Sequence, residues 1–289
     1  MNRRNLLKSV LIGASALAIR PSFSIAADAD DTKKRLAELE RRYGGRLGVA
    51  ILDTGSERRI VYRADERFMM CSTFKLLLVG ATLARVDHGA ERLDRRVVFG
   101  QEAVLSYAPV TSRHVGAPGM TVAELCQAAI AVSDNTAANL LVASLGGPAA
   151  VTAYARQLGD PLTRLDHIEP ELNVPSADHV SDTTTPNAML GDLRTLVLGN
   201  ALSDTSRKQL IEWLCETTTS KDLLRAGIPA GWRVGDKTGS GYGATNDVAI
   251  IWPPQRKPLL VATYYAGATA DAARPSALFT EVGRIAASM

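Results

Sequence analysis

A serine, two lysines and a glutamate lie in four short motifs that together could carry out acyl transfer. In chain order, the motifs are Ser72-Thr73-Phe74-Lys75, Ser133-Asp134-Asn135, Glu169-Pro170-Glu171-Leu172-Asn173 and Lys237-Thr238-Gly239. Each motif is weak alone, because short patterns of common residues recur by chance. If they were independent, all four would occur together in on the order of 1 in 10,000 chains of this length. The combination therefore indicates a serine acyl-transfer site.

Ser72 and Lys75 have the spacing of a nucleophile and its base. A serine hydroxyl is a poor nucleophile at neutral pH and needs a base nearby. Residues three apart on a helix lie on the same face, one turn apart, so the Lys75 amine can reach the Ser72 hydroxyl. The amine must first lose a proton, and we expect burial and the positive charge of Lys237 to lower its pKa.

The four motifs resemble those of the class A serine β-lactamases, and the resemblance runs from about Leu36 to Ile285. It implies an enzyme that hydrolyses the β-lactam ring of penicillins and cephalosporins through an acyl-serine intermediate and so confers antibiotic resistance. It also implies a monomer without cofactor or metal, whose partner is a small-molecule β-lactam. The histidines agree with a metal-free site, since His88, His114, His167 and His179 show no metal-ligand spacing.

The resemblance gives catalytic roles to Ser72, Lys75, Ser133 and Glu169. Ser133 would deliver a proton to the departing ring nitrogen, because breaking the C–N bond needs an acid there. Glu169 would deprotonate the water that hydrolyses the acyl-serine, and Asn173 would be the second holder of that water. Either Lys75 or Glu169 could take the Ser72 proton in the first step.

A further set of residues would bind the substrate. The set is Tyr107, Asn135, Asn173, Lys237, Thr238, Gly239 and Ser240. Asn135 would hold the side-chain amide of the substrate, and Tyr107 would lie at the mouth of the cleft. The lysine and the hydroxyls of the 237–240 segment would bind the substrate carboxylate, and its glycine would allow close approach to the backbone. The backbone N–H groups of Ser72 and Ser240 would form the oxyanion hole.

Two positions depart from the pattern of this family. Many relatives have an arginine two residues before the catalytic glutamate, paired with the residue that corresponds to Asp182, but this chain has His167. An imidazole makes a weaker, pH-dependent contact than a bidentate guanidinium, so we predict a more mobile loop and easier entry for bulky cephalosporins. Ser240 adds to the expectation of cephalosporin or slow carbapenem turnover. Asn246 stands where several relatives have a carboxylate-holding arginine, and Arg274 could replace it.

Two rival functions share part of the pattern. A penicillin-binding D-Ala-D-Ala peptidase shares the Ser-x-x-Lys and Lys-Thr-Gly motifs but lacks the Glu169 loop. A β-lactam sensor stays acylated, needs a transmembrane segment and usually lacks the deacylating glutamate. The presence of the loop argues against both rivals.

Residues 1–26 predict an export signal. Arg3, Arg4 and Lys8 precede an apolar run at 10–19 that is too short to span a bilayer, and small residues follow. Cleavage after Ala26, on a twin-arginine or an ordinary secretory route, would deliver the chain to the periplasm. It would remove four basic residues and leave 29 basic and 30 acidic ones, a formal charge of −1. No basic run with interleaved aromatics remains, so we expect no nucleic-acid partner and no membrane partner.

The cysteines predict no disulfide. Cys126 matches a residue that forms half of a disulfide in many relatives, but the other half aligns with Val79. Cys71 adjoins Ser72, yet successive helical residues point about 100° apart, so the two cannot serve one site. We therefore expect Cys71 to be a buried structural thiol.

Strand patterns at both chain ends flank a helical block. Alternating residues at 46–52 and 59–62 indicate a hairpin, and further strands are expected at 232–236, 248–252 and 259–265. Helices are expected at 31–43 and 276–287. The segment 72–215 is rich in Ala and Leu at helical spacing.

These elements predict an α+β fold of the β-lactamase/transpeptidase type. An antiparallel five-stranded sheet from both chain ends, flanked by helices, would form one domain from residues 28–69 and 217–289. Residues 70–216 would form an inserted all-helical domain that carries Ser72, Ser133 and the Glu169 loop. Such an insertion leaves a cleft between the domains, where small-molecule sites are common.

Overall fold

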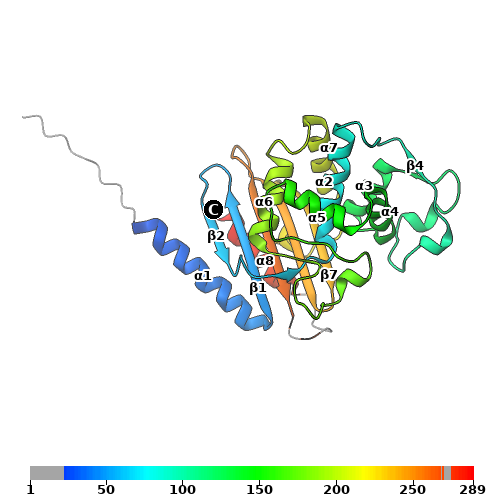
Figure 1. Ribbon diagram of the computed structural model, residues 1–289. Coiled ribbons are helices and arrows are strands. Elements are labelled where there is room, and N and C mark those ends of the chain that lie inside the picture. The colour runs from blue at the N-terminus through cyan, green and yellow to red at the C-terminus, as the bar shows by residue number, and fades with distance from the viewer. Residues whose placement is uncertain (1–22, 268, 270–274) are drawn as a thin grey trace, which may run out of the picture.

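Five antiparallel strands from both ends of the chain form the central sheet of the computed structural model (Figure 1). They are β1 (Arg46–Asp53), β2 (Arg59–Tyr62), β7 (Arg233–Gly241), β8 (Ala244–Trp252) and β9 (Leu259–Ala266), in the order β2-β1-β9-β8-β7. The structure describes residues 23–267, 269 and 275–289. Most of the predicted export signal, and Arg274, lie outside these residues. The α+β fold predicted from the sequence is confirmed.

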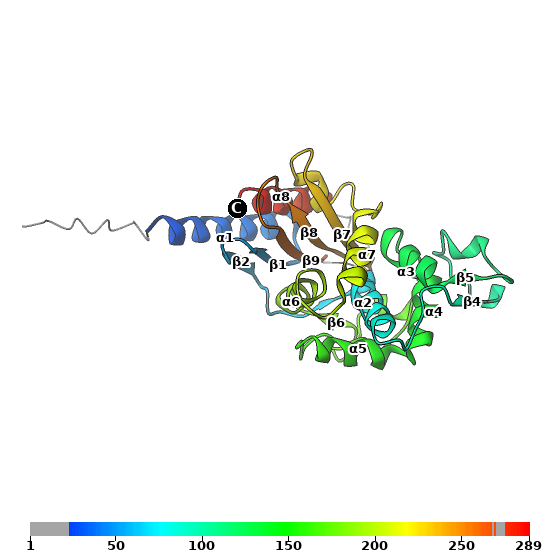
Figure 2. The ribbon, with the colours of Figure 1, turned by 90° about the horizontal axis from the view of Figure 1, so that it is seen from above.

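Helices cover both faces of the sheet. Helices α1 (Phe23–Tyr43) and α8 (Ser276–Ala287) lie on one face, and α6 (Pro186–Val197) lies on the other (Figure 2). Successive strand residues point to opposite faces, so each central strand supplies side chains to two separate apolar clusters. In β1, Leu47, Val49 and Ile51 join the cluster under α8, whereas Ala50 and Leu52 join the cluster on the α6 side. The sheet is therefore the middle layer of a sandwich.

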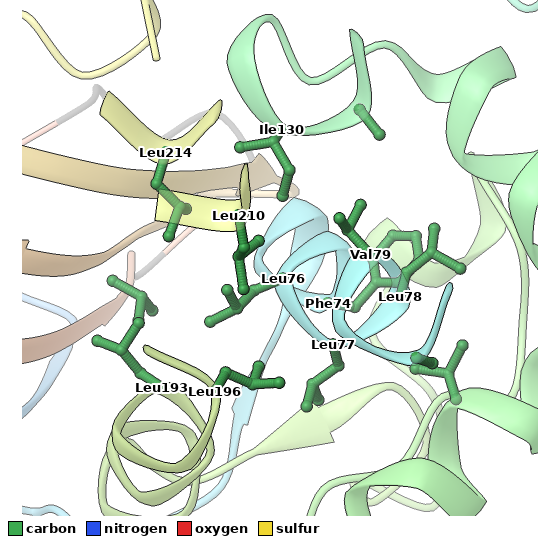
Figure 3. Packing of buried hydrophobic residues seen from close by; sticks show 14 of the residues in the cluster. Phe74, Leu76, Leu77, Leu78, Val79, Ile130, Leu193, Leu196, Leu210 and Leu214 are labelled. Carbon is green, nitrogen blue, oxygen red and sulfur yellow. The ribbon is translucent and has the colours of Figure 1, made fainter. Parts of the chain in front are cut away.

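The remaining long helices gather beside the sheet around α2. They are α2 (Phe74–Asp87), α3 (Val122–Ala131), α4 (Asn135–Leu145), α5 (Pro148–Gln157) and α7 (Asp204–Cys215). The first ten residues of α2 are all buried. Figure 3 shows side chains of α2 meeting Ile130 of α3, Leu193 and Leu196 of α6, and Leu210 and Leu214 of α7. A helix that is apolar on all sides is expected at the centre of a core, and this packing fixes the start of α2 in space.

Short elements connect the two parts. Strand β3 (Phe68–Met69) pairs with β6 (Thr183–Thr184), and β4 (Arg96–Val97) pairs with β5 (Met120–Thr121). The 3₁₀ helices are η1 (Cys71–Thr73), η2 (Gln101–Ala103), η3 (Thr111–Arg113), η4 (Glu171–Asn173) and η5 (Leu224–Gly227). Among the described residues, no single helix is long and apolar enough to cross a membrane; α4 and α5 together pass such a test, with a 74° bend between them.

The structure extends two of the predicted strands. The hairpin and the closing helix lie where the sequence predicts them, but β7 continues to Gly241 and β8 begins at Ala244. These additions are polar or small, for example Thr245, Asn246 and Asp247, and their sequence lacks apolar alternation. Ladder pairing supplies what the local pattern does not, since β8 pairs with β9 on one side and with the edge strand β7 on the other.

Candidate active site

The first motif lies where η1 runs into α2. Ser72 is 8% exposed, and its hydroxyl donates to Glu169 Oε1 at 3.1 Å. Lys75 is fully buried one turn later, and its Nζ lies 3.1 Å from the same Oε1. The Glu169 carboxylate therefore contacts both the serine hydroxyl and the lysine amine.

Two further groups surround the Lys75 amine. Its Nζ donates to Asn135 Oδ1 at 2.6 Å, to the Ser133 carbonyl at 2.9 Å and to Ser133 Oγ at 3.3 Å. Burial lowers the pKa of Lys75, while the nearby Glu169 carboxylate acts in the opposite direction. The pKa of Lys75 is thus lowered, as predicted, and burial is the main cause. The charged groups that act on this pKa most are the neighbouring carboxylates, which raise it, and not Lys237.

Lys237 approaches the same serine from the sheet. Its Nζ, at the edge strand β7, donates to Ser133 Oγ at 3.0 Å and to the Thr238 carbonyl at 2.7 Å. Burial lowers the pKa of Lys237 to about 7, and the positive charge of Lys75 adds to this shift. Ser133 Oγ thus lies between two buried amines that can exchange a proton with it.

The Ser133-Asp134-Asn135 motif forms the rigid junction between α3 and α4. Ser133 has a positive φ of 59°, which directs its side chain toward the two lysines. Asp134 caps α4 by accepting from Ala137 N at 2.9 Å, and it also accepts from the Thr111 amide and hydroxyl. These bonds hold the aspartate in a structural position and leave Ser133 and Asn135 facing the cleft.

Glu169 lies on a loop that two asparagines hold in place. Asn139 of α4 accepts from Glu169 N at 3.0 Å and donates to the Glu169 carbonyl at 2.8 Å. Asn173 Nδ2 donates to Glu169 Oε2 at 2.5 Å, and Leu172 between them is fully buried. The carboxylate is 1% exposed, so its position is set by hydrogen bonds on both oxygens rather than by solvent.

An aspartate closes the base of this loop. Asp182 Oδ1 accepts from the backbone N–H groups of Asp166 and His167, and Asp182 Oδ2 lies 2.6 Å from His167 Nδ1. The carboxylate of Asp182 raises the pKa of His167. His167 therefore contacts Asp182 as the sequence comparison suggests, and the strength of this contact depends on whether the imidazole is protonated.

The Lys-Thr-Gly-Ser segment of β7 forms the wall opposite Ser72. A Cβ on Gly239 would lie 2.7 Å from the Met70 carbonyl and 3.2 Å from Ser72 N, so only glycine allows this approach. The Thr238 hydroxyl shares a 2.6 Å hydrogen bond with Thr219. The two strand positions around Gly239 thus present hydroxyls beside the nucleophile.

The two walls enclose a cleft of about 630 Å³. It is lined by Ser72, Tyr107, Ser133, Asn135, Asn173, Thr218, Thr219, Lys221, Asp222, Thr238, Gly239 and Ser240. The predicted site residues Lys75, Glu169 and Lys237 lie buried behind this lining, and Tyr107 is 48% exposed at its edge, with its hydroxyl donating to the Val132 carbonyl. The structure therefore brings all eleven predicted residues together.

The sequence sets Asn246 against a carboxylate-holding arginine of relatives, and the structure shows where its side chain lies. Asn246 does not line the cleft; it is fully buried, and its Nδ2 donates to the Met69 and Met70 carbonyls at 2.9 Å each. Asn246 pairs with Gly239, whereas its neighbour Thr245 pairs with Ser240. Because strand side chains alternate, Asn246 points away from the face on which a carboxylate-holding residue would stand.

The sequence did not predict the segment from Thr218 to Asp222 as part of the site. It lies between α7 and η5 and has no motif, so only its place beside β7 reveals it. The cysteines at 71, 126 and 215 are free, and burial raises the pKa of Cys71 to about 12, as suits a structural thiol. Across the described residues, no group of three or more His, Cys, Asp or Glu is placed to hold a metal.

Known proteins match this chain over nearly its full length. Residues 31–288 match the profile of the Beta-lactamase enzyme family. β-Lactamase OXY-1 of Klebsiella oxytoca is 45% identical over 92% of this chain and 91% of its own length, and CTX-M-25 of Escherichia coli is 46% identical with the same coverage.

Solved structures agree. An ancestral class A β-lactamase (GNCA) superimposes with a TM-score of 0.86 at 59% identity, covering 89% of this chain and 98% of its own. The putative class A β-lactamase PenP of Rhodopseudomonas palustris gives 0.86 at 54% identity, covering 90% and 100%. With the serine, lysine and glutamate in contact in one cleft, the chain belongs to the class A β-lactamases, the enzymes that hydrolyse the β-lactam ring.

Proposed function

We propose that Ser72, Lys75, Ser133 and Glu169 divide the hydrolysis of the β-lactam ring among them, with Ser72 as the nucleophile. The observation that carries the proposal is the Glu169 carboxylate, which is 1% exposed and accepts from both Ser72 Oγ and Asn173 Nδ2. A carboxylate held in this way can remove a proton from a group beside Ser72 without first losing solvent.

The first step acylates the serine. Ser72 Oγ attacks the lactam carbonyl carbon and loses its proton to Glu169, which its hydroxyl already contacts, while the buried Lys75 amine steadies the carboxylate from 3.1 Å. The backbone N–H groups of Ser72 and Ser240 stabilise the oxygen that becomes negative. The proposal thus assigns the first proton to Glu169, directly or through a water, and gives Lys75 the supporting role.

Collapse of this intermediate breaks the C–N bond. The ring nitrogen leaves as an amine and needs a proton, which Ser133 Oγ supplies. Ser133 then recovers a proton from Lys75 or Lys237, whose Nζ atoms lie 3.3 Å and 3.0 Å from its oxygen. The ring is now open, and its carbonyl is esterified to Ser72.

Before deacylation, Glu169 passes the proton that it took from Ser72 to the amine of Lys75, 3.1 Å away, and Ser133 relays it to Lys237 where that lysine was the donor. Both lysines are then charged again, and the free carboxylate can be used a second time. A water between Glu169 and Asn173 loses a proton to Glu169 and attacks the ester carbonyl, and the Ser72 oxygen leaves with a proton. The products are free Ser72 and the ring-opened acid. A penicillin-binding peptidase or a β-lactam sensor would lack this last step.

Substrate binding follows from the cleft walls. The ammonium of Lys237 and the hydroxyls of Thr238 and Ser240 bind the carboxylate of penicillins and cephalosporins, and Asn135 with Tyr107 receives the acylamide side. Gly239 allows the ring to lie against the strand.

The proposal also includes a monomeric state, export to the periplasm and a domain division at residues 70 and 216. The positively charged and then apolar N-terminal sequence supports the export.

The test compares the natural protein with Glu169→Ala, using excess chromogenic cephalosporin followed by absorbance and intact mass. We expect multiple turnover by the natural protein. In the variant, which lacks the base of both steps, we expect an adduct on Ser72 that forms slowly and then persists, with turnover lowered at least 10³-fold. Glu169→Gln is the matched control for shape, since the amide keeps the hydrogen-bonding geometry but cannot take a proton. A single burst with a lasting adduct in the natural protein itself would overturn the proposal in favour of a peptidase or sensor.

A further inference from the structure

Lys221 is the one cation among the described residues that line the cleft. The other two lysines of the site are buried and occupied: Lys75 contacts Glu169, and Lys237 donates to Ser133 and to the Thr238 carbonyl. Lys221 is exposed, and no hydrogen bond or ion pair of its ammonium occurs among the described residues. The ammonium of Lys221 is therefore open to an anionic substrate in the cleft.

The turn that carries Lys221 is fixed to both parts of the protein. Thr217 donates to the Asp236 carbonyl of β7, and Thr218 N donates to the Ala131 carbonyl of α3 at 3.0 Å. Leu223 N then donates back to the Ser220 carbonyl at 2.9 Å, which closes the turn. The backbone of Lys221 is thereby held at the cleft wall while its side chain stays free to reach a ligand.

The surroundings of Lys221 favour a carboxylate. Thr219 stands two residues away, and its hydroxyl is bonded to that of Thr238, so the ammonium and the hydroxyls line one wall. The neighbouring anion, Asp222, accepts from the Ser276 hydroxyl at 2.6 Å at the start of α8. The long, flexible side chain of Lys221 can bring a positive charge to these hydroxyls, where Lys237 would otherwise be the only cation to bind a carboxylate.

We propose that Lys221 is a specificity-determining residue that binds the carboxylate of the β-lactam substrate from the cleft rim, together with the Thr238 and Ser240 hydroxyls. This inference rests on the proposed placement of the carboxylate at the β7 wall. It assigns Lys221 no part in the chemical steps, so its contact stabilises the bound substrate and the transition state equally. Such uniform binding changes KM and leaves kcat in place.

The test compares Lys221→Ala and Lys221→Arg with the natural protein on two substrates, a chromogenic cephalosporin and its neutral methyl ester. We expect Lys221→Ala to raise KM for the acid about 3- to 5-fold, the range of a solvent-exposed charge contact, with kcat within about 2-fold. The arginine variant should restore KM, and 0.5 M NaCl should shrink the difference between the natural and alanine forms. The ester should show no such difference.

A matched control separates this contact from a general charge effect. Lys208→Ala removes an exposed lysine on α7, outside the cleft lining, and should leave both substrates unchanged. An equal rise of KM for acid and ester in Lys221→Ala would overturn the proposal in favour of a packing role, and an unchanged KM would overturn it outright. Failure of the proposed function is distinct, since the natural protein itself would then show no turnover.

Discussion

Two buried amines are placed to exchange protons with Ser133, as the proposed mechanism requires. Lys75 and Lys237 both reach Ser133, and burial lowers the pKa of each. A lysine with an ordinary pKa would hold its proton too tightly to pass it on at neutral pH. The site therefore depends on desolvation, which the packed start of α2 and the edge of β7 provide together.

The pKa of Lys237, at about 7, predicts a pH-dependent affinity for anionic substrates. The ammonium is charged below this value and neutral above it, so kcat/KM for a carboxylate-bearing cephalosporin should fall as pH rises through about 7 in the free enzyme. Steady-state kinetics between pH 5.5 and 9 measure this fall.

Two comparisons test whether Lys237 causes the fall of kcat/KM with rising pH. Lys237→Arg keeps its charge over the whole range, so its profile should be flat above pH 7 even if its rates are lower. The neutral ester should also lack the fall in the natural protein. The same midpoint for the ester would instead assign the titration to Lys75 or Glu169.

Among the elements, the loop from Arg164 to Asp182 carries Glu169, which in the proposed mechanism distinguishes hydrolysis from a lasting acyl-enzyme. It is held to α4 by Asn139 and closed at its base by Asp182, and Arg164 forms an ion pair with Asp166, donating from Nε at 2.9 Å. Most of these contacts are independent of pH near neutrality. The contact between His167 and Asp182 is the exception.

His167→Arg tests how this clamp controls the loop. Asp182 raises the pKa of His167 in the folded protein above 6.5. The contribution of the His167–Asp182 contact to the stability of the fold is therefore complete below pH 6.5 and is lost as the pH rises through this folded-state pKa. An arginine stays charged at these pH values, so the free energy of unfolding of the variant, measured in urea, should not decline over this range. The decline in the natural protein should be small, because the His167 side chain is half-exposed. We also expect the variant to lower the turnover of bulky cephalosporins relative to penicillins. An unchanged substrate ratio would show that the clamp does not govern entry.

At the scale of the whole molecule, charges buried between the layers make the stability depend on pH. Asp192 of α6 is 1% exposed and lies beside the carboxylate of Asp160, which accepts from Leu162 N and Thr163 N just before the loop that carries Glu169. Burial, and then the charge of Asp160, raises the pKa of Asp192 well above its usual value. We therefore expect Asp192 to keep its proton in the folded protein at pH values where an exposed aspartate is ionised.

Asp192→Asn should remove one pH-dependent contribution to the stability. Because the folded-state pKa is raised, the folded form holds a proton that the unfolded form releases above about 4, and the free energy of unfolding declines by up to about 1.4 kcal/mol per pH unit until the folded-state pKa is reached. The amide cannot ionise, so the variant should lack this decline. Urea unfolding at pH 5 to 9 measures it, with the exposed Asp94→Asn as control. Parallel curves for the natural protein and Asp192→Asn would contradict the assignment.

The acyl-transfer motifs and the α+β fold class could be predicted from local patterns in the chain. Ser72 and Lys75 are close in the chain, so their contact through Glu169 needs only one helical turn and one loop, and the motif order indicates the partners. The hairpin of β1 and β2 and the closing helix α8 were predictable because their apolar periods match their structures. The Ser72–Lys75 pair, the hairpin and the closing helix are features that local spacing fixes, whereas Glu169 was assigned through the resemblance of its motif.

Which side chains face the cleft, and how burial shifts their pKa values, depends on packing between segments that are far apart in the chain. Asn246 and Thr245 are neighbours in β8, and their side chains point to opposite faces of the sheet. Asn246 faces the Met69 and Met70 carbonyls, so an error of one residue in the predicted register would place the wrong side chain in the cleft. Lys221 carries no motif, and its place on the cleft wall follows from hydrogen bonds to elements far away in the chain. The pKa shifts likewise depend on desolvation by packed layers, a property of the assembled molecule that no local pattern contains.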